Sequence, residues 1–362
     1  MNPHRSVLVA LAPIILLIAL GCDKKASLGT FVPTPTPLSP GTPRTWQDLE
    51  LSQSYVGVEA LTSWNGKLIA GGDFFDVNGV PITALASWNG TSWTRMGPHF
   101  GSAVQALAVR NGNLIVGGSF PHINGDTLRY VAEWDGTKWT PLGSGFDRSI
   151  SALTIYNGDL IAGGYFDLAG GVPARNIARW DGTSWHPLGG GLDNTVWTLT
   201  VYNGQLIAGG DFLKADGSLA PHIAAWNGSS WSSPGGGVDG TVMALGLHGN
   251  VLVAGGTFTT AGATLARHVA TWNGAQWDSL GPGLGVFSYE SVRAFAEYGD
   301  TLVAGGNFPG SVRRWDGSAW VPMQDLYGTV HALTMYDGWL IAGGWFPRSE
   351  GNICNGIARW VP

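Results

Sequence analysis

Few charges and almost no cysteine distinguish this chain of 362 residues. Asp, Glu, Lys and Arg make up only 12% of it, and the net charge is −6. Because no basic excess is present to neutralise phosphates, the composition argues against a nucleic-acid-binding protein. The two cysteines, Cys22 and Cys354, show no zinc-site spacing, so we expect no metal and no cofactor. A disulfide between them is the less favoured alternative.

Glycine and tryptophan, by contrast, are abundant, with 56 and 18 residues. Much of the glycine belongs to one stretch, Leu-Ile-Ala-Gly-Gly-x-Phe, which first occurs at residues 68–74. Seven copies of Gly-Gly-x-Phe follow one another, and their second glycines are Gly72, Gly118, Gly164, Gly210, Gly256, Gly306 and Gly344. The first five of these glycines are 46 residues apart, so the chain consists of a repeated unit.

Each unit predicts a four-stranded antiparallel sheet. In the unit at residues 150–188, four runs rich in β-forming residues are separated by turn signals. Asn157-Gly158 predicts a type I′ hairpin, because both central residues of that turn need a positive φ. Pro187 places the fourth strand at an outer edge, where a missing N–H is tolerated. Such units arranged radially are the blades of a β-propeller.

Two tryptophan series indicate how the ring closes. The third strands carry Trp88, Trp134, Trp180, Trp226, Trp272, Trp315 and Trp360, and the fourth strands carry Trp46, Trp93, Trp139, Trp185, Trp231, Trp277 and Trp320. The last unit stops after its third strand, whereas residues 45–49 match a fourth strand. We therefore predict an all-β fold for residues 45–362, a seven-bladed β-propeller of four-stranded antiparallel blades. An N-terminal outer strand completes the last blade and removes two exposed sheet edges.

The diglycine, the aromatic residue after it and the spaced Trp resemble the Kelch repeat over the whole of residues 45–362. The repeat sequence is similar to that of Kelch-like propellers of bacterial surface proteins and of fungal cortical polarity markers. Trp180-Asp181 invites comparison with WD-type repeats, but their Gly-His element is missing. Kelch-like oxidases use a copper set of Tyr, Tyr–Cys and His that has no counterpart here. The resemblance implies the propeller fold and no particular activity.

The first 44 residues predict export and a tether. His4 and Arg5 precede an apolar run that ends at Gly21-Cys22, as in an export signal. Residues 1–21 resemble the signal peptide of bacterial lipoproteins, in which Cys22 would become the lipidated first residue. A plain secretory signal and a short uncleaved anchor are the alternatives. Residues 22–44 are rich in Pro and Thr and predict an extended linker. We expect a membrane-anchored lipoprotein at the cell envelope or surface, or a secreted protein.

Binding residues are expected where the repeat varies, because variable positions on a rigid frame form binding sites. One variable column follows the residue that starts each unit: Glu59, Gln105, Ser151, Trp197, Met243, Arg293 and His331. A second lies between Gly-Gly and Phe: Asp73, Ser119, Tyr165, Asp211, Thr257, Asn307 and Trp345. From these columns we predict that a ligand-binding surface at the channel mouth includes Glu59, Trp197, Arg293, His331, Tyr165 and Trp345. Drift at solvated positions is the alternative.

No catalytic residue can be chosen from this sequence. Its eight histidines are scattered, and spacing alone indicates neither a Ser, His and Asp set nor a pair of carboxylates. We therefore expect a monomeric binding scaffold for a protein or polysaccharide partner rather than an enzyme. The alternative is an exported, glycan-active hydrolase, lyase or oxidase with its site at the channel mouth.

Overall fold

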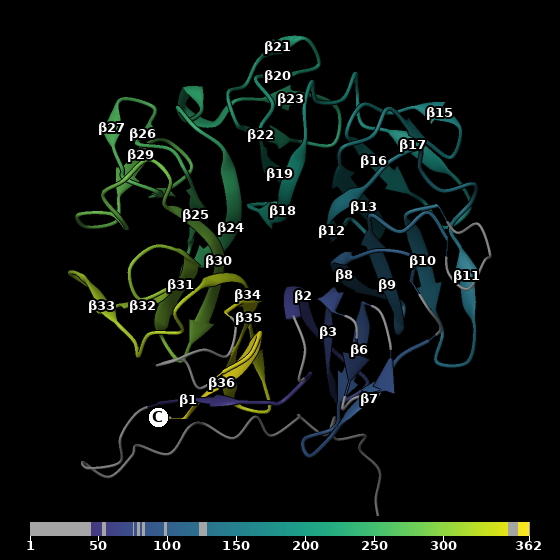
Figure 1. Ribbon diagram of the computed structural model, residues 1–362. Helices are drawn as coiled ribbons and strands as arrows, with labels where there is room; N and C mark the ends of the chain where they lie inside the picture. The colour runs from purple at the N-terminus through teal and green to yellow at the C-terminus, as the bar shows by residue number, and fades with distance from the viewer. Residues whose placement is uncertain are drawn as a thin grey trace, which may run out of the picture. The chain divides into compact units, whose positions relative to one another are not determined.

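The computed structural model describes residues 45–361, apart from 53–55, 75, 78–79, 82–83, 98–99, 123–128 and 347–353. The predicted signal peptide, the linker and Cys22 lie outside the described residues. The described chain forms seven four-stranded antiparallel sheets around a central axis (Figure 1). This confirms the predicted all-β, seven-bladed propeller. None of the helices in these residues is long or apolar enough to cross a membrane, and the 3-10 turn η1 (Pro234–Gly236) is a short connection.

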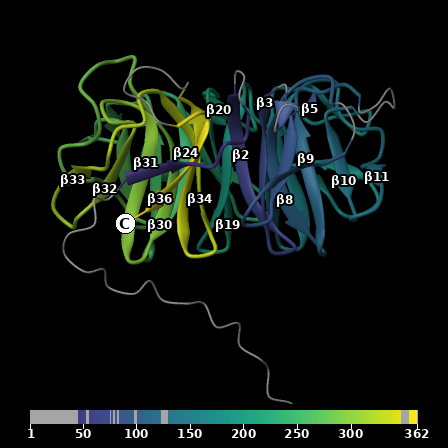
Figure 2. The same cartoon turned by 60° about the horizontal axis from the view of Figure 1, so that its bottom comes forward.

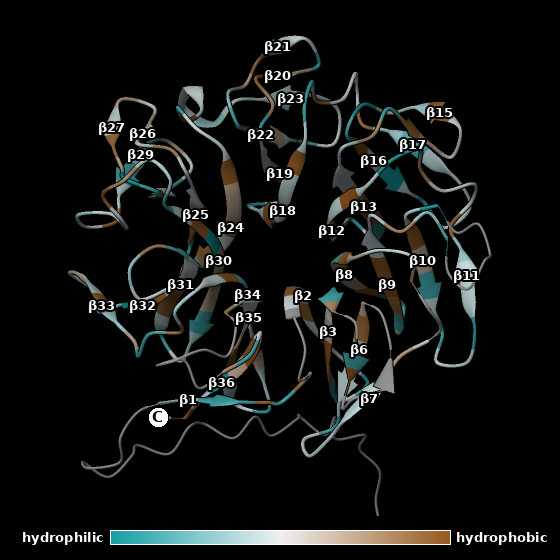
Figure 3. Ribbon diagram, viewed as in Figure 1, coloured by the Kyte–Doolittle hydropathy of each residue, from teal (hydrophilic) through white to brown (hydrophobic). Residues whose placement is uncertain are grey.

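The two inner strands of each blade form the core of the ring. The first strands, nearest the axis, are β2 (Val56–Trp64), β8 (Val104–Arg110), β12 (Ile150–Tyr156), β18 (Val196–Tyr202), β24 (Val242–His248), β30 (Ser291–Tyr298) and β34 (Thr329–Tyr336). The second strands are β3 (Lys67–Phe74), β9 (Asn113–Gly118), β13 (Asp159–Gly164), β19 (Gln205–Gly210), β25 (Val251–Gly256), β31 (Thr301–Asn307) and β35 (Trp339–Trp345). The second strands are buried along most of their length because blades cover both of their faces. Hydrophobic residues accordingly concentrate on inner strands such as β18 and β24 (Figure 3).

The two outer strands are shorter and more exposed. The third strands are β6 (Leu85–Trp88), β10 (Val131–Trp134), β16 (Ile177–Trp180), β22 (Ile223–Trp226), β28 (Val269–Trp272), β32 (Val312–Trp315) and β36 (Ile357–Val361). The fourth strands are β7 (Trp93–Arg95), β11 (Trp139–Pro141), β17 (Trp185–Pro187), β23 (Trp231–Ser232), β29 (Trp277–Ser279), β33 (Trp320–Pro322) and β1 (Thr45–Asp48). Strand β1 pairs with β36, which confirms the predicted closure of the last blade by the N-terminal strand.

Loops leave the strands at two ends of the ring (Figure 2). One end, which we call the hairpin face, carries the tight turns between first and second strands. Asn157 and Gly158 both have positive φ there, which confirms the predicted type I′ geometry. The other end, the loop face, carries the longer connections. These include small hairpins that the sequence did not predict, namely β4 (Asp76–Val77) with β5 (Val80–Pro81), β14 (Leu168–Ala169) with β15 (Val172–Pro173), β20 (Lys214–Ala215) with β21 (Ser218–Leu219), and β26 (Thr260–Ala261) with β27 (Thr264–Leu265).

The seven tryptophan pairs hold each blade together and join it to its neighbour. In every blade the third-strand Trp lies directly opposite the fourth-strand Trp, with ring centroids 5.0 to 5.5 Å apart. The indole N–H of Trp185 also donates to Leu142 O in the connection from the preceding blade, at 2.8 Å. Trp277 donates to Pro234 O in the same way, at 2.9 Å. The repeated Trp residues therefore connect strands within a blade, and residues such as Trp185 and Trp277 also connect neighbouring blades.

Candidate functional site

Seven β-bulges give the first variable column its place in the structure. In every blade the pairing of the first strand with the second slips by one residue. The residues left outside the ladder are Glu59, Gln105, Ser151, Trp197, Met243, Arg293 and His331. A bulge changes the direction of a side chain that regular pairing would fix. The column that varies in sequence is thus the column of bulged residues.

The diglycine makes these bulges possible. Gly210, the second glycine of its pair, faces the first strand of its own blade, and a Cβ there would clash with Thr195 O. A Cβ on the second glycine of each of the other six copies would likewise meet a backbone oxygen in the first strand or in the residue just before it. The first glycine faces the next blade instead, where a Cβ on Gly163 would lie 2.6 Å from Val196 Cγ1. One glycine thus admits the bulge and the other admits the neighbouring blade.

The bulged residues converge on a cavity at the centre of the ring. This cavity has a volume of about 510 Å³, and all seven bulged residues line it, together with the Ala, Thr, Leu and Phe residues that follow them. A volume of this size lies within the range of small-molecule sites. The structure therefore places Glu59, Trp197, Arg293 and His331, four of the six predicted site residues, around one space.

The charged side chains occupy one arc of the cavity, formed by blades that are neighbours in the ring. Glu59 Oε2 lies 2.6 Å from His331 Nδ1, and both side chains are partly buried. Burial lowers the pKa of the Arg293 guanidinium, and the nearby Glu59 carboxylate opposes this shift. Arg293 Nε donates to Ser291 Oγ at 3.2 Å, and this hydrogen bond helps to hold the guanidinium in position. The arc thus offers a guanidinium, an imidazole and a carboxylate.

The opposite arc is uncharged and partly apolar. It is formed by Gln105, Ser151, Trp197 and Met243. The indole N–H of Trp197 donates to Asp211 Oδ2 at 2.8 Å, so the ring is held in place although 39% of the residue is exposed. The amide Oε1 of Gln105 is buried and has no hydrogen-bond partner among the described residues. Such an oxygen is costly to leave unpaired.

The other two predicted site residues lie outside the cavity. Tyr165 follows the second strand of its blade, β13, and Trp345 is the last residue of β35. Both lie on the loop face, where they are 49% and 45% exposed. Neither residue lines the cavity. The strand pleat explains this position, since the preceding glycine and the following Phe are buried and the residue between them points away from the core. Tyr165 stacks instead under the Arg148 guanidinium, at 4.9 Å.

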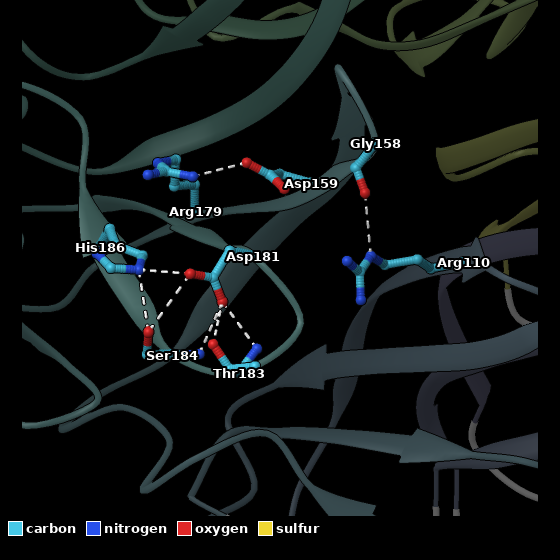
Figure 4. Close-up of polar contacts among 8 residues, drawn as sticks. All are labelled: Arg110, Gly158, Asp159, Arg179, Asp181, Thr183, Ser184 and His186. Carbon is cyan, nitrogen blue, oxygen red and sulfur yellow. Dashed lines mark hydrogen bonds and ion pairs between the residues drawn. The ribbon is translucent and has the colours of Figure 1, made fainter.

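A Ser, His and Asp cluster on an outer strand does not have the geometry of a catalytic triad. His186 Nε2 lies 2.7 Å from Asp181 Oδ2 and 3.0 Å from Ser184 Oγ (Figure 4). In a hydrolytic triad the acid and the nucleophile contact different ring nitrogens. Asp181 is also committed to its turn, because the backbone N–H groups of Ser184 and Thr183 hold its pKa well below the usual range. This cluster therefore stabilises the turn before the outer strand and does not form a catalytic site.

Acidic residues elsewhere also support loops. Asp193 Oδ1 accepts hydrogen bonds from the backbone N–H groups of Leu213 and Lys214. Asp147 and Asp239 accept equivalent pairs in their own blades. In the part of the chain that the structure describes, no three His, Cys, Asp or Glu side chains are grouped as metal ligands.

The sequence did not predict the concentration of exposed apolar residues on the loop face. The large hydrophobic residues with high exposure are Tyr165, Leu168, Val172, Trp197, Leu213, Leu219, Leu265, Val286, Phe287, Tyr289, Tyr327 and Trp345 on the loop face, and Val109 and Leu247 near the hairpin face. Phe287 and Tyr289 stack on one another with ring centroids 5.3 Å apart. The sequence feature that could have predicted these exposed residues is the presence of apolar residues at the tips of loops that otherwise differ between repeats.

Comparison with solved structures gives propellers as neighbours. The chain is similar to the WD40 repeats of RRP9, with a TM-score of 0.58 and 13% identity over 88% of this chain and 99% of that one. It is similar to the WD40 beta propeller domain of Doa1, with a TM-score of 0.56 and 12% identity over 88% and 96%. It is also similar to the computationally designed Ika8 protein, with a TM-score of 0.50 and 17% identity over 84% of this chain and 82% of that one. At such identities the likeness shows the fold alone. No protein-family model and no curated protein matches the chain.

Proposed function

We propose that this propeller is a binding scaffold that takes a protein partner on its loop face. The observation that carries this proposal is the placement of exposed large apolar side chains. Among the described residues they lie on the loop face, with the exception of Val109 and Leu247. Tyr, Trp and Phe are among them, and these residues are enriched in protein interfaces. A gathering of exposed large apolar side chains on one face of a domain is a feature of interaction sites.

The test is crosslinking from both faces in cells that produce the protein. A photoreactive phenylalanine analogue is placed at Trp345 or Leu213 on the loop face, and at Val109 as the matched control on the other face. We expect a protein adduct from the two loop-face positions and none from Val109. With the purified adduct partner, Leu213→Ser should weaken binding by about tenfold, whereas Leu247→Ser should change it less than about twofold. Equal adducts from both faces, or an adduct that only glycosidases remove, would contradict a protein partner.

The proposal extends to the location of the protein. We infer that residues 1–21 direct export and that Cys22 carries a lipid that tethers the propeller through the linker at residues 22–44. The support is the sequence at Gly21-Cys22 and the apolar run before it. The Kelch-like character of the repeat, supported by the diglycine, belongs to this proposal too. Labelling with an alkyne fatty acid should mark the wild type and not Cys22→Ser. A labelled variant, or an unlabelled wild type in the soluble fraction, would refute the lipid anchor.

An exported enzyme is the second candidate, and the Glu59–His331 pair is the observation that favours it. A carboxylate 2.6 Å from one ring nitrogen orients an imidazole, as in general-base catalysis. Arg293 nearby offers a positive charge. An enzyme would lose hydrolysis or elimination of glycans in His331→Gln while retaining binding. If the wild type turns over no glycan, the enzyme candidate is refuted and the binding scaffold is the remaining candidate.

A further inference from the structure

The lining of the central cavity selects a particular class of ligand. Its bulged residues include one carboxylate, Glu59, and one guanidinium, Arg293, whose charges offset one another. Beyond the lining, Asp211 at the end of a neighbouring strand adds a negative charge near the mouth through its contact with Trp197. A strongly anionic ligand would meet Glu59 and Asp211, and a cationic ligand would meet Arg293. The electrostatics therefore favour an uncharged ligand.

The same lining is rich in hydrogen-bonding groups. Arg293 supplies donors, Glu59 supplies acceptors, and the His331 ring has a second nitrogen besides the one that contacts Glu59. Gln105 has an amide oxygen that lacks a partner within the described residues. A ligand that fills this cavity must carry both hydrogen-bond donors and acceptors. Otherwise the polar groups that it covers would stay unpaired, which would cost binding free energy.

The uncharged arc complements these groups with a flat apolar surface. Trp197 is fixed by its hydrogen bond to Asp211, so its indole ring is preorganised. Met243 lines the same cavity. A saccharide has this combination of properties, because its hydroxyl groups donate and accept hydrogen bonds while the C–H face of its ring packs on an aromatic side chain.

We propose that the central cavity binds the end of a neutral saccharide, with Trp197 under the sugar ring and Gln105, Glu59, Arg293 and His331 on its hydroxyl groups. The volume of about 510 Å³ is ample for a ligand of this kind. Apart from Trp197, the exposed residues that we propose for a protein partner, such as Trp345 and Leu213, lie outside the cavity. Saccharide binding would thus survive a failure of the protein-partner proposal, and the reverse also holds.

The first test is an array of immobilised neutral and acidic glycans probed with the full chain. We expect binding to at least one neutral glycan, with little change on raising the salt concentration. Trp197→Ala should weaken this binding about tenfold or more, and Gln105→Leu should weaken it too. The matched control is Leu247→Ala, which removes an exposed apolar side chain near the hairpin face, outside the cavity, and should alter binding less than about twofold.

The second test reads the cavity directly. With methyl-labelled methionine, the bound glycan should shift the NMR signal of Met243, which lines the cavity, and leave unchanged that of Met96, which does not line it. The proposal is overturned by the absence of neutral-glycan binding, by equal losses in Trp197→Ala and Leu247→Ala, or by an unmoved Met243 signal. Binding confined to acidic glycans and weakened by salt would identify an anion site and would also overturn it.

Discussion

At the scale of single residues, the repeated motif separates structural positions from variable ones. The two glycines and the Phe of each copy are fixed by contacts within the blade and with its neighbour, as at Gly163, Gly210 and Phe212. Packing does not restrict the bulged residue opposite them in this way, because its side chain points into the cavity. Substitutions at the glycines should therefore lower the stability of the fold. Substitutions at the bulged residues should instead weaken ligand binding.

Gly210→Ala tests the steric role of the second glycine. The new Cβ would clash with Thr195 O and with the Phe212 ring, so we expect a loss of about 3 kcal/mol in the free energy of unfolding. The measurement is the urea midpoint. Gly57→Ala is the matched control, since a Cβ there would come no closer than 3.7 Å to any atom. Equal midpoints for the two variants would refute the clash.

Asp135 should make the fold sensitive to acid. The Thr137 hydroxyl and the backbone N–H groups of Lys138 and Thr137 lower the pKa of this carboxyl from 3.8 to about 2. A lowered pKa means that the folded state favours the carboxylate, so its contribution is complete above about pH 4 and is lost as the pH falls to 2. We expect a carboxyl titration midpoint near pH 2 by NMR. Between pH 4 and 2, Asp135→Asn should lose less thermal stability than the wild type does.

Asn89→Asp provides the reciprocal control, because Asn89 accepts the same hydrogen bonds in the turn of another blade. This variant should acquire the acid sensitivity that Asp135→Asn loses. A normal midpoint for Asp135, near 4, would show that the turn does not bind the carboxylate in solution.

At the scale of elements, the sequence was sufficient for the blades but not for the bulges. Turn signals such as Asn157-Gly158 and the spacing of Trp180 and Trp185 define four strands and their order, because these depend on local periodicity. A bulge depends on which residue opposes the diglycine across the sheet, and that register is a tertiary property. Variation alone therefore located Trp197 and His331 but did not distinguish them from Tyr165, which stays outside the cavity.

Strand β1 should act as a separable element of the fold. Trp46 on this strand is 1% exposed and packs edge-on against Trp360 at 5.3 Å. A chain lacking residues 45–48 should lose at least about 4 kcal/mol, since a buried Trp and a strand pairing disappear together. A synthetic peptide of residues 44–52 should restore the melting temperature. The same peptide with Trp46→Ala should not, and rescue by both peptides, or by neither, would contradict a specific closing strand.

At the scale of the whole molecule, closure makes the interface between the last and first blades equivalent to every other. The Cβ of an alanine at Gly343 would lie 2.5 Å from Val58 Cγ1 across this seam, and one at Gly163 would lie 2.6 Å from Val196 Cγ1 inside the ring. If the ring stays closed in solution, Gly343→Ala and Gly163→Ala should lower the melting temperature by similar amounts, corresponding to about 2 kcal/mol each. An opening seam would relieve the clash at Gly343 only. A much smaller effect of Gly343→Ala would therefore show that the blades separate there, and that the cavity formed by Glu59 and His331 on the two sides of this seam opens with them.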